Sequence, residues 1–410
     1  MGAKADLGKT EGRSRRPFRC REPSREHRRG PRNGLRKAGI AGLGSALVFL
    51  TSGIAEAQVR SGIGSTFTVT GTARSITPIA MFGGDERRPL DMHSSLRRFI
   101  GRLRQADTGS VCSAFCIATN VVATAGHCVQ SVLDGGGLDA LRFAIDADRE
   151  TTGARIAGAG EGRAPFNVLT GASELRTRPP INAVSDWAFL RLERPACPAG
   201  GLKLTTLPTD ELARRSRERR VYHVSYHRDV ADWRLMIARP CRVVTNLPQQ
   251  ISALLEQDFD DPRNLLLHDC DTGAASSGSP LLTDGDNGPE VVGINIGTYV
   301  RSRVVTHDGE VVQRLASEPI ANTALLAASL DRRLAAFIAT DVTTRRAAIA
   351  RMQSRLRAIG LYDGAVDGTF GLATRGAIMA FERGLGETET GLPSHRVLKQ
   401  LEALTAASND

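Results

Sequence analysis

The stretch VVATAGHC, residues 121–128, places a histidine directly after an apolar, β-branched run. Such a run predicts a buried strand, so His127 is expected at the end of that strand. Ala125 and Gly126 are small and leave room for a substrate backbone, and Cys128 can fix the segment covalently. His127 is therefore the candidate general base, because imidazole changes its charge near neutral pH.

Two further stretches contain the groups that a histidine base needs. The stretch DWAFLRL begins with Asp186, a carboxylate at the mouth of an apolar strand that can orient His127. The stretch DTGAASSGSP, residues 271–280, is rich in small residues, so that backbone N–H groups can converge around a serine. Ser277 is the predicted nucleophile, and the N–H groups of Ala275 and Ser277 are the predicted oxyanion hole.

These three stretches resemble the histidine, aspartate and serine motifs of trypsin-like serine proteases. The Gly-Ser-Pro ending of the third is similar to bacterial glutamyl-endopeptidase-like enzymes. The order His127, Asp186, Ser277 is the chymotrypsin-like one. The resemblance covers roughly residues 80–340 and implies a mainly β fold, a chymotrypsin-like double β-barrel, with serine endopeptidase activity. It implies no metal or organic cofactor. Short β-branched runs separated by Gly, Pro and Asp independently predict an all-β region.

Two residues depart from the family pattern. Ser276 stands where trypsin-like zymogens have an aspartate that pairs with a freed N-terminus. We therefore expect activation without that ion pair. Ala275 stands where the family usually has glycine, and alanine tolerates a positive φ less well.

The substrate-binding candidates are Asp271, Asn295 and Gly297. Asp271 stands where trypsin-like enzymes place the acid that binds Arg or Lys; the alternative is that it bonds local backbone. A preference for glutamate would favour a histidine on the strand after the serine, where this chain has Asn295. The segment from Asn295 to Gly297 is predicted to pair with the substrate backbone as an edge strand.

Six cysteines follow the N-terminal tail, an even number that indicates disulfides in an exported protein. The resemblance implies a histidine-loop disulfide between Cys112 and Cys128. Three pairings are open for the other four cysteines. The pairing that we propose joins Cys241 to Cys270 and Cys116 to Cys197. The sequence holds no CxxC pair, which leaves a zinc site without support.

The net charge of +10 comes almost entirely from the N-terminus. Residues 1–37 hold 13 Lys and Arg against 4 Asp and Glu, and the rest of the chain is nearly neutral. A nucleic-acid partner therefore has no support. This basic region precedes an apolar stretch, residues 38–55, and an Ala-Glu-Ala site. The pattern predicts a secretory signal peptide over residues 1–57, or a membrane anchor where it stays uncleaved.

The 410 residues are too many for one ordinary domain. Residues 58–94 are predicted to be a linker or leading arm, and residues 95–340 a trypsin-like serine protease domain. The apolar period then becomes helical, and residues 343–405 are predicted to form a small three-helix α module. Gly360 is expected to end its first helix, and its third helix is expected to be short.

The stretch LYDGAVDGTFG, which begins at Leu361, is the most distinctive motif of this C-terminal module. With its flanking helices it resembles the peptidoglycan-binding three-helix domain. Tyr362 and Phe370 are either core or glycan-contacting residues. Glu382 stands where the family commonly has glutamine.

Together, these resemblances imply an exported bacterial serine endopeptidase that is localised by a peptidoglycan-binding-like domain. Its expected place is periplasmic or secreted, at the cell wall, with a protein or peptide as substrate and peptidoglycan as a second partner. A membrane contact is expected only through an uncleaved N-terminal segment. The alternative is a non-catalytic wall-binding or adaptor protein on a protease-like scaffold. A wall hydrolase has less support, because no metal cluster or paired acidic constellation is visible in the sequence.

Overall fold

The structure is a computed structural model. It describes residues 58–60, 66–77, 81–106, 109, 111–135, 137–145, 153–172, 174–197, 200–230, 233–238, 240–244, 247, 249–307 and 310–407. Only the backbone is described for residues 58–60, 66–72, 134–135, 303–307, 310–317 and 405–407. The predicted signal peptide or anchor, residues 1–57, lies outside this part of the chain. Within it, no helix has both the length and the apolar character needed to cross a membrane.

The first sheet has seven strands in the order β8-β7-β4-β5-β6-β10-β9, all paired antiparallel. The strands are β4 (Ile100–Gln105), β5 (Val111–Ala118), β6 (Val121–Thr124), β7 (Leu141–Ile145), β8 (Ala154–Arg155), β9 (Val168–Thr170) and β10 (Ala188–Arg191). The apolar runs that the sequence marks around His127 and Asp186 become the neighbouring strands β6 and β10. Short helices connect them: η1 (Ser95–Arg98), α1 (His127–Gly135), η2 (Gly137–Ala140), η3 (Ala164–Asn167) and η4 (Ala183–Ser185).

The second sheet follows the order β14-β15-β18-β17-β16-β12-β13-β3, with β2 and β11 also on β17, and β1 on β2. Its strands are β1 (Gln58–Arg60), β2 (Thr66–Thr77), β3 (Arg87–Pro89), β11 (Lys203–Leu204), β12 (Val221–Tyr226), β13 (Leu235–Ala238), β14 (Val243–Val244), β15 (Leu265–His268), β16 (Pro280–Gly285), β17 (Gly288–His307) and β18 (Glu310–Leu326). Two curled antiparallel half-barrels followed by a helical region confirm the predicted fold class.

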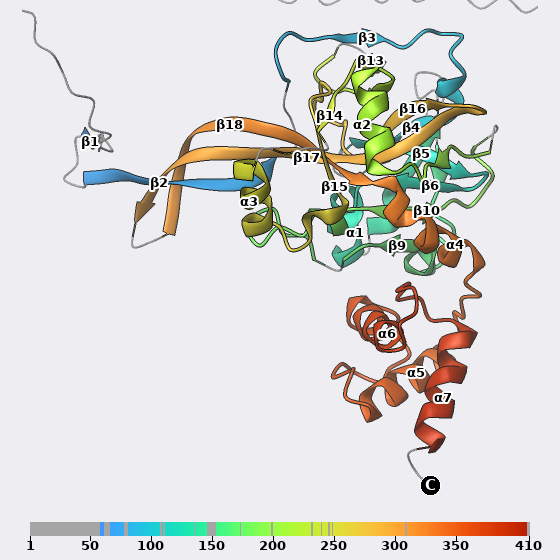
Figure 1. The fold of residues 1–410 in the computed structure, drawn as a ribbon. Helices are drawn as coiled ribbons and strands as arrows, with labels where there is room; N and C mark the ends of the chain where they lie inside the picture. Colours follow the sequence, from blue (N-terminus) through green and yellow to red (C-terminus); the bar gives the residue numbers. More distant parts are fainter. Residues whose placement is uncertain are drawn as a thin grey trace, which may run out of the picture. The chain divides into compact units, whose positions relative to one another are not determined.

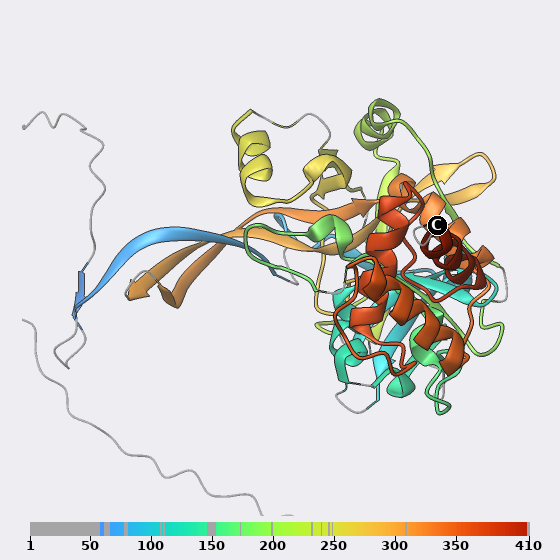
Figure 2. The same cartoon turned by 90° about the horizontal axis from the view of Figure 1, so that it is seen from below.

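Strands β2, β17 and β18 are longer than the sequence pattern predicts. They run side by side beyond the rest of the second sheet in both views (Figures 1 and 2). β2 and β3 come from the segment 58–94, so that parts of this segment belong to the second sheet. The pairing of β2 with β17 was not predicted, because its partners lie far apart in sequence.

The remaining helices are α2 (Thr209–Arg217), α3 (Gln249–Asp258), η6 (Pro262–Asn264), η7 (Ala327–Leu330), α4 (Asp331–Ala339), α5 (Arg346–Ala358), α6 (Leu372–Gly384) and α7 (His395–Ala407). α3 was not predicted. α5 to α7 form the C-terminal module. The short third helix expected there is wrong, because α7 has 13 residues. Ser394 caps it by accepting a hydrogen bond from the N–H of Val397, and its face with Leu398 and Leu401 is buried.

Buried polar side chains fix the loop of the C-terminal module. The Gln353 side chain accepts a hydrogen bond from the N–H of Gly368 at 2.8 Å and donates one to the carbonyl of Thr369 at 3.0 Å. Tyr362 and Phe370 are both buried. In this structure they therefore serve as core residues of the module.

Candidate active site

His127 lies where β6 ends and α1 begins. Its main-chain N–H donates to Asp186 Oδ1, and its Nδ1 bonds Asp186 Oδ2, both at 2.8 Å. One carboxylate thus holds both the backbone and the ring of His127. Gly126 permits this approach, since a Cβ there would lie 3.1 Å from the N of Trp187 and 3.2 Å from Asp186 Oδ1.

The His127 ring is partly open, with its side chain 37% exposed, while Asp186 is buried. Burial lowers the pKa of His127, but the charge of Asp186 and its hydrogen bond outweigh that effect and raise the pKa above its ordinary value. A donor at Nδ1 leaves Nε2 of the neutral ring free to accept a proton. The pair therefore has the groups of a general base and its orienting acid.

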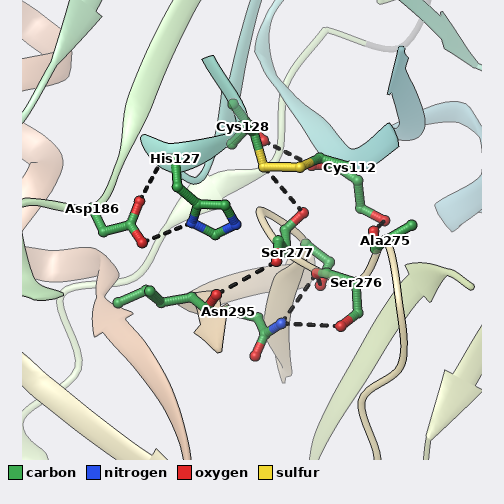
Figure 3. The surroundings of a disulfide bond; sticks show 12 residues. Cys112, His127, Cys128, Asp186, Ala275, Ser276, Ser277 and Asn295 are labelled. Atoms are coloured by element: carbon green, nitrogen blue, oxygen red, sulfur yellow. Dashed lines mark hydrogen bonds and ion pairs between the residues drawn. A yellow bond between two sulfur atoms is a disulfide. The ribbon is translucent and has the colours of Figure 1, made fainter. Parts of the chain in front are cut away.

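Ser277 lies beside the imidazole, so that His127 is between Asp186 and Ser277 (Figure 3). The serine is buried, and its Oγ donates a 3.5 Å hydrogen bond to the carbonyl of Ile296 on β17. Its own carbonyl accepts a hydrogen bond from the N–H of Ser113 on β5 at 2.9 Å. The first sheet thus holds the serine loop directly.

Ala275 has φ 78°, in the left-handed region that costs a non-glycine residue about 1–2 kcal/mol. Neighbours hold this turn: Ser113 Oγ donates to the carbonyl of Ala275 at 3.0 Å, and the N–H of Ser276 donates to the carbonyl of Gly273 at 3.0 Å. The expected difficulty of alanine at this position is thus met by surrounding contacts. Strain of this kind is maintained only where the surroundings over-determine it.

Asp271 is buried and its carboxylate is engaged by main-chain groups of the chain's own N-terminal part. Oδ2 accepts a hydrogen bond from the N–H of Glu86 at 2.7 Å, and Oδ1 accepts one from Phe82 at 3.4 Å. This matches the alternative in which Asp271 bonds backbone, although the backbone is distant in sequence and not local. We call residues 81–89 the anchoring segment.

Arg87 of the anchoring segment is a functional candidate that the sequence reasoning missed. Its side chain is only 4% exposed and forms ion pairs with Asp85 at 2.8 Å and Asp229 at 2.7 Å. Its Nη1 lies 2.9 Å from Nδ1 of His227. These groups pack under the serine loop, because a Cβ on Gly273 would lie 2.3 Å from Asp229 and 2.5 Å from Arg87. One arginine among the 54 Lys and Arg residues carries no local signal of this role.

Three buried histidines, His223, His227 and His268, lie in the second sheet and its neighbouring turn. Their ring centroids are 6.2 Å apart for His223 and His227, and 6.4 Å apart for His223 and His268. Burial lowers the pKa of His223 and of His227 to about 3 and that of His268 to about 4, so all three are neutral near pH 7. His223 Nε2 bonds Ser279 Oγ at 2.5 Å, behind the serine loop. These contacts are consistent with a structural role for the three histidines.

Asn295 and Gly297, the remaining substrate-binding candidates, lie on β17. The buried Asn295 side chain donates to the carbonyl of Ser276 at 3.1 Å, so that it orders the serine loop. Gly297 lies against Thr77, whose carbonyl oxygen would be 2.7 Å from an added Cβ. The edge predicted for substrate is thus adjacent to β2.

The structure contains three disulfides, in the pairing proposed from the sequence. Cys112–Cys128 joins β5 to α1 beside His127 (Figure 3). The other two are Cys116–Cys197 and Cys241–Cys270.

Residues 112–294 match the family model of the "Trypsin-like peptidase domain", and residues 345–401 match that of the "Putative peptidoglycan binding domain". The chain thus joins a region similar to the trypsin-like peptidase domain to a region similar to the putative peptidoglycan binding domain. His127, Asp186 and Ser277 all fall within the matched part of the peptidase domain. The disulfides and the peptidoglycan-binding domain together suggest an extracytoplasmic location.

Two solved structures are similar to the chain at low identity. The secreted serine protease VesC from Vibrio cholerae is 15% identical, with 63% of this chain and 49% of that chain covered and a TM-score of 0.41. The present chain thus spans about half the length of that protein. An inactivated protease paralogue of the scabies mite, S-D1, is 14% identical, with 62% and 96% covered and a TM-score of 0.40. No match was found among curated proteins.

Proposed function

We propose that this chain is an exported serine endopeptidase that hydrolyses peptide bonds with His127, Asp186 and Ser277. The observation that carries the proposal is the pair of hydrogen bonds that join the ring and the main-chain N–H of His127 to the Asp186 carboxylate. Ser277 lies on the other side of the imidazole (Figure 3). The match to the trypsin-like peptidase domain supports the same reaction class.

In the proposed reaction, the Ser277 hydroxyl turns from the Ile296 carbonyl to Nε2 of His127. His127 takes the hydroxyl proton while Oγ attacks the scissile carbonyl, and it then gives the proton to the leaving amine. Water attacks the acyl-enzyme by the same route. Asp186 keeps Nδ1 protonated and stabilises the imidazolium that forms.

The N–H groups of Ala275 and Ser277 are proposed to bind the oxyanion. The positive φ of Ala275 supports this assignment, because backbone strain of this kind clusters at active sites. A donor in an oxyanion hole contributes about 2.7–4 kcal/mol to stabilisation of the transition state.

A fluorophosphonate probe tests the proposal. The purified chain should gain one probe mass in an intact-mass spectrum, and Ser277→Ala should gain none at matched circular dichroism. An unlabelled, folded wild-type chain would contradict the proposal and favour a non-catalytic scaffold. Such a result would mean that Ser277 keeps its hydrogen bond to the Ile296 carbonyl and does not turn to His127.

We further propose that the peptidoglycan-binding domain holds the enzyme at the cell wall, in the periplasm or outside the cell. Its family match supports this role. The Ser277→Ala chain, which cannot digest itself, should sediment with purified sacculi and be released by soluble peptidoglycan fragments. A chain that stays in the supernatant would contradict wall binding without affecting the proposed catalysis.

A further inference from the structure

Among the described residues, one edge of β17 has a short stretch next to Ser277 with no paired strand, which we call the opening. β18 pairs with one edge from Ile294 opposite Leu325 to Thr298 opposite Asn322, with a register shift at Ile296. The other edge is therefore shared by β16 and β2. β16 and the turn before it pair with this edge up to Asn295, whose N–H donates to the carbonyl of Ser279.

β2 takes the same edge from Thr298 onward, where Thr298 lies opposite Thr77. In the described part of the chain, only Ile296 and Gly297 lie between the two partners without a strand opposite them on this edge. The opening coincides with the nucleophile, since the Ile296 carbonyl bonds Ser277 Oγ. A peptide placed for attack by Ser277 would pair with this edge of β17.

β2 closes this opening tightly at its end. An added Cβ on Gly297 would lie 2.7 Å from the Thr77 carbonyl oxygen and 2.8 Å from Cγ2 of Ile76. On its other side, the N–H of Ile76 donates to the carbonyl of Thr177 at 2.9 Å, in the segment that leads to Asp186. β2 is thus held between β17 and that segment.

An ion pair fixes β2 in this position. The Arg74 guanidinium pairs with the buried carboxylate of Asp258 at the end of α3. The Tyr299 hydroxyl on β17 donates a hydrogen bond to the same carboxylate at 2.5 Å. The Asp258 carboxylate therefore joins β2, α3 and β17.

We propose that β2 limits how many substrate residues can bind on the N-terminal side of the cleaved bond. This proposal rests on the proposed endopeptidase function. β2 runs antiparallel to β17 and ends at Thr77. A substrate peptide that pairs with β17 in the same direction as β2 would therefore have its N-terminal end facing Thr77. From Thr298 onward, β2 already occupies the positions that a longer N-terminal extension would take. Longer N-terminal extensions meet Thr77 and bind only where β2 is displaced. Without β2, such extensions would bind more tightly, because they would form main-chain hydrogen bonds with β17.

Two matched peptides test the proposal, each with the same cleaved bond chosen by profiling. The short peptide has two residues on the N-terminal side of the bond, and the long one has five. The wild-type ratio of kcat/KM, long over short, should be one or below. In Arg74→Ala, which loses the Asp258 ion pair, this ratio should rise at least about tenfold, as expected for a few regained main-chain hydrogen bonds.

Arg263→Ala is the matched control, because Arg263 forms an exposed ion pair with Asp261 that does not touch β2. Its ratio should equal that of the wild type. Ile76→Pro, which removes the N–H that bonds Thr177, gives a second route to the same rise should Arg74→Ala fold poorly. A wild-type chain that prefers the long peptide as strongly as these variants would overturn the proposal.

A synthetic peptide with the sequence of residues 66–77 adds a test in trans. It should inhibit cleavage of the long peptide by Arg74→Ala, and a scrambled peptide should not; equal inhibition by both would count against the proposal. Failure of the proposed function itself looks different. In that case neither peptide is cleaved by any variant, and the fluorophosphonate probe does not label Ser277.

Discussion

The two sheets support their parts of the candidate site in different ways. In the first sheet, His127 is bonded directly by Asp186 and flanked by the Cys112–Cys128 disulfide. In the second sheet, the Ser277 loop rests on the anchoring segment, through contacts between residues 140 to 189 positions apart. The histidine part thus depends on one direct pair, and the serine part depends on a remote segment of chain.

Asp186→Asn breaks the direct pair of the first sheet and should have the largest effect. An amide cannot hold the Nδ1–H tautomer of His127, and kcat should fall about 10⁴-fold. Turnover of a fluorogenic peptide measures this. Asp286→Asn, at an exposed position, should leave kcat unchanged. Retention of a tenth of the activity by Asp186→Asn would show that the pair does not orient the base.

Arg87→Met removes the support of the second sheet. It leaves Asp229 and His227 without their cation under the Gly273 turn, and the displaced loop should lower kcat about 100-fold with little change in KM. Arg87→Lys should restore part of kcat. Arg88→Met, an exposed neighbour on β3, is the control. A folded Arg87→Met chain with normal kcat would mean that the anchoring segment serves stability alone.

The acid limb of the pH profile should come from the first sheet only. His127 must be neutral to accept the serine proton, and Asp186 raises its pKa, so kcat/KM should fall below a midpoint above about 6.5. Each further pH unit should lower it about tenfold. His223 and His227, with pKa values of about 3, should add no limb above pH 5. A second limb near pH 6 that persists in Asp186→Asn would contradict this separation.

Ser113→Ala tests the link between the sheets and should have the smallest effect. Ser113 Oγ donates to the Ala275 carbonyl and accepts from the N–H of Tyr226, both at 3.0 Å. Loss of bonds worth about 1 kcal/mol each should lower kcat about fivefold. Ser131→Ala, exposed on α1, serves as the control in the same assay. An unchanged kcat in Ser113→Ala would show that the side-chain bonds of Ser113 contribute nothing to the site, and that the link between the sheets rests on its main-chain bond to Ser277.

The sequence predicted the residues whose signal is local. Apolar runs became β6 and β10, which place His127 and Asp186, and the small-residue stretch became the loop of Ser277. The fold class followed from the same motifs. For the three-helix module, the glycine after α5 and the apolar period were sufficient, although the length of α7 was not.

The support of the site could not be predicted, because its partners are distant in sequence. Asp271 looked like a candidate for binding basic side chains, and only the structure brings the N–H groups of Phe82 and Glu86 to it. In the segment 58–94, Phe67 and Val69 alternate with threonine, but nothing in the local sequence indicates that β2 pairs with β17 or that Arg87 lies under the serine loop. Pairing over such separations leaves no mark within a local window.

The long-range placement of the N-terminal strands also has a kinetic consequence. Arg74 and Glu86 reach partners 184 and 185 residues later, so their contacts form only after most of the chain has been synthesised. Loop closure over such distances is slow, and folds dominated by non-local pairing fold slowly. The first residues of the described chain are thus expected to be among the last to fold. Completion of the Ser277 loop would then mark the end of folding, and newly made chains would remain inactive until that step.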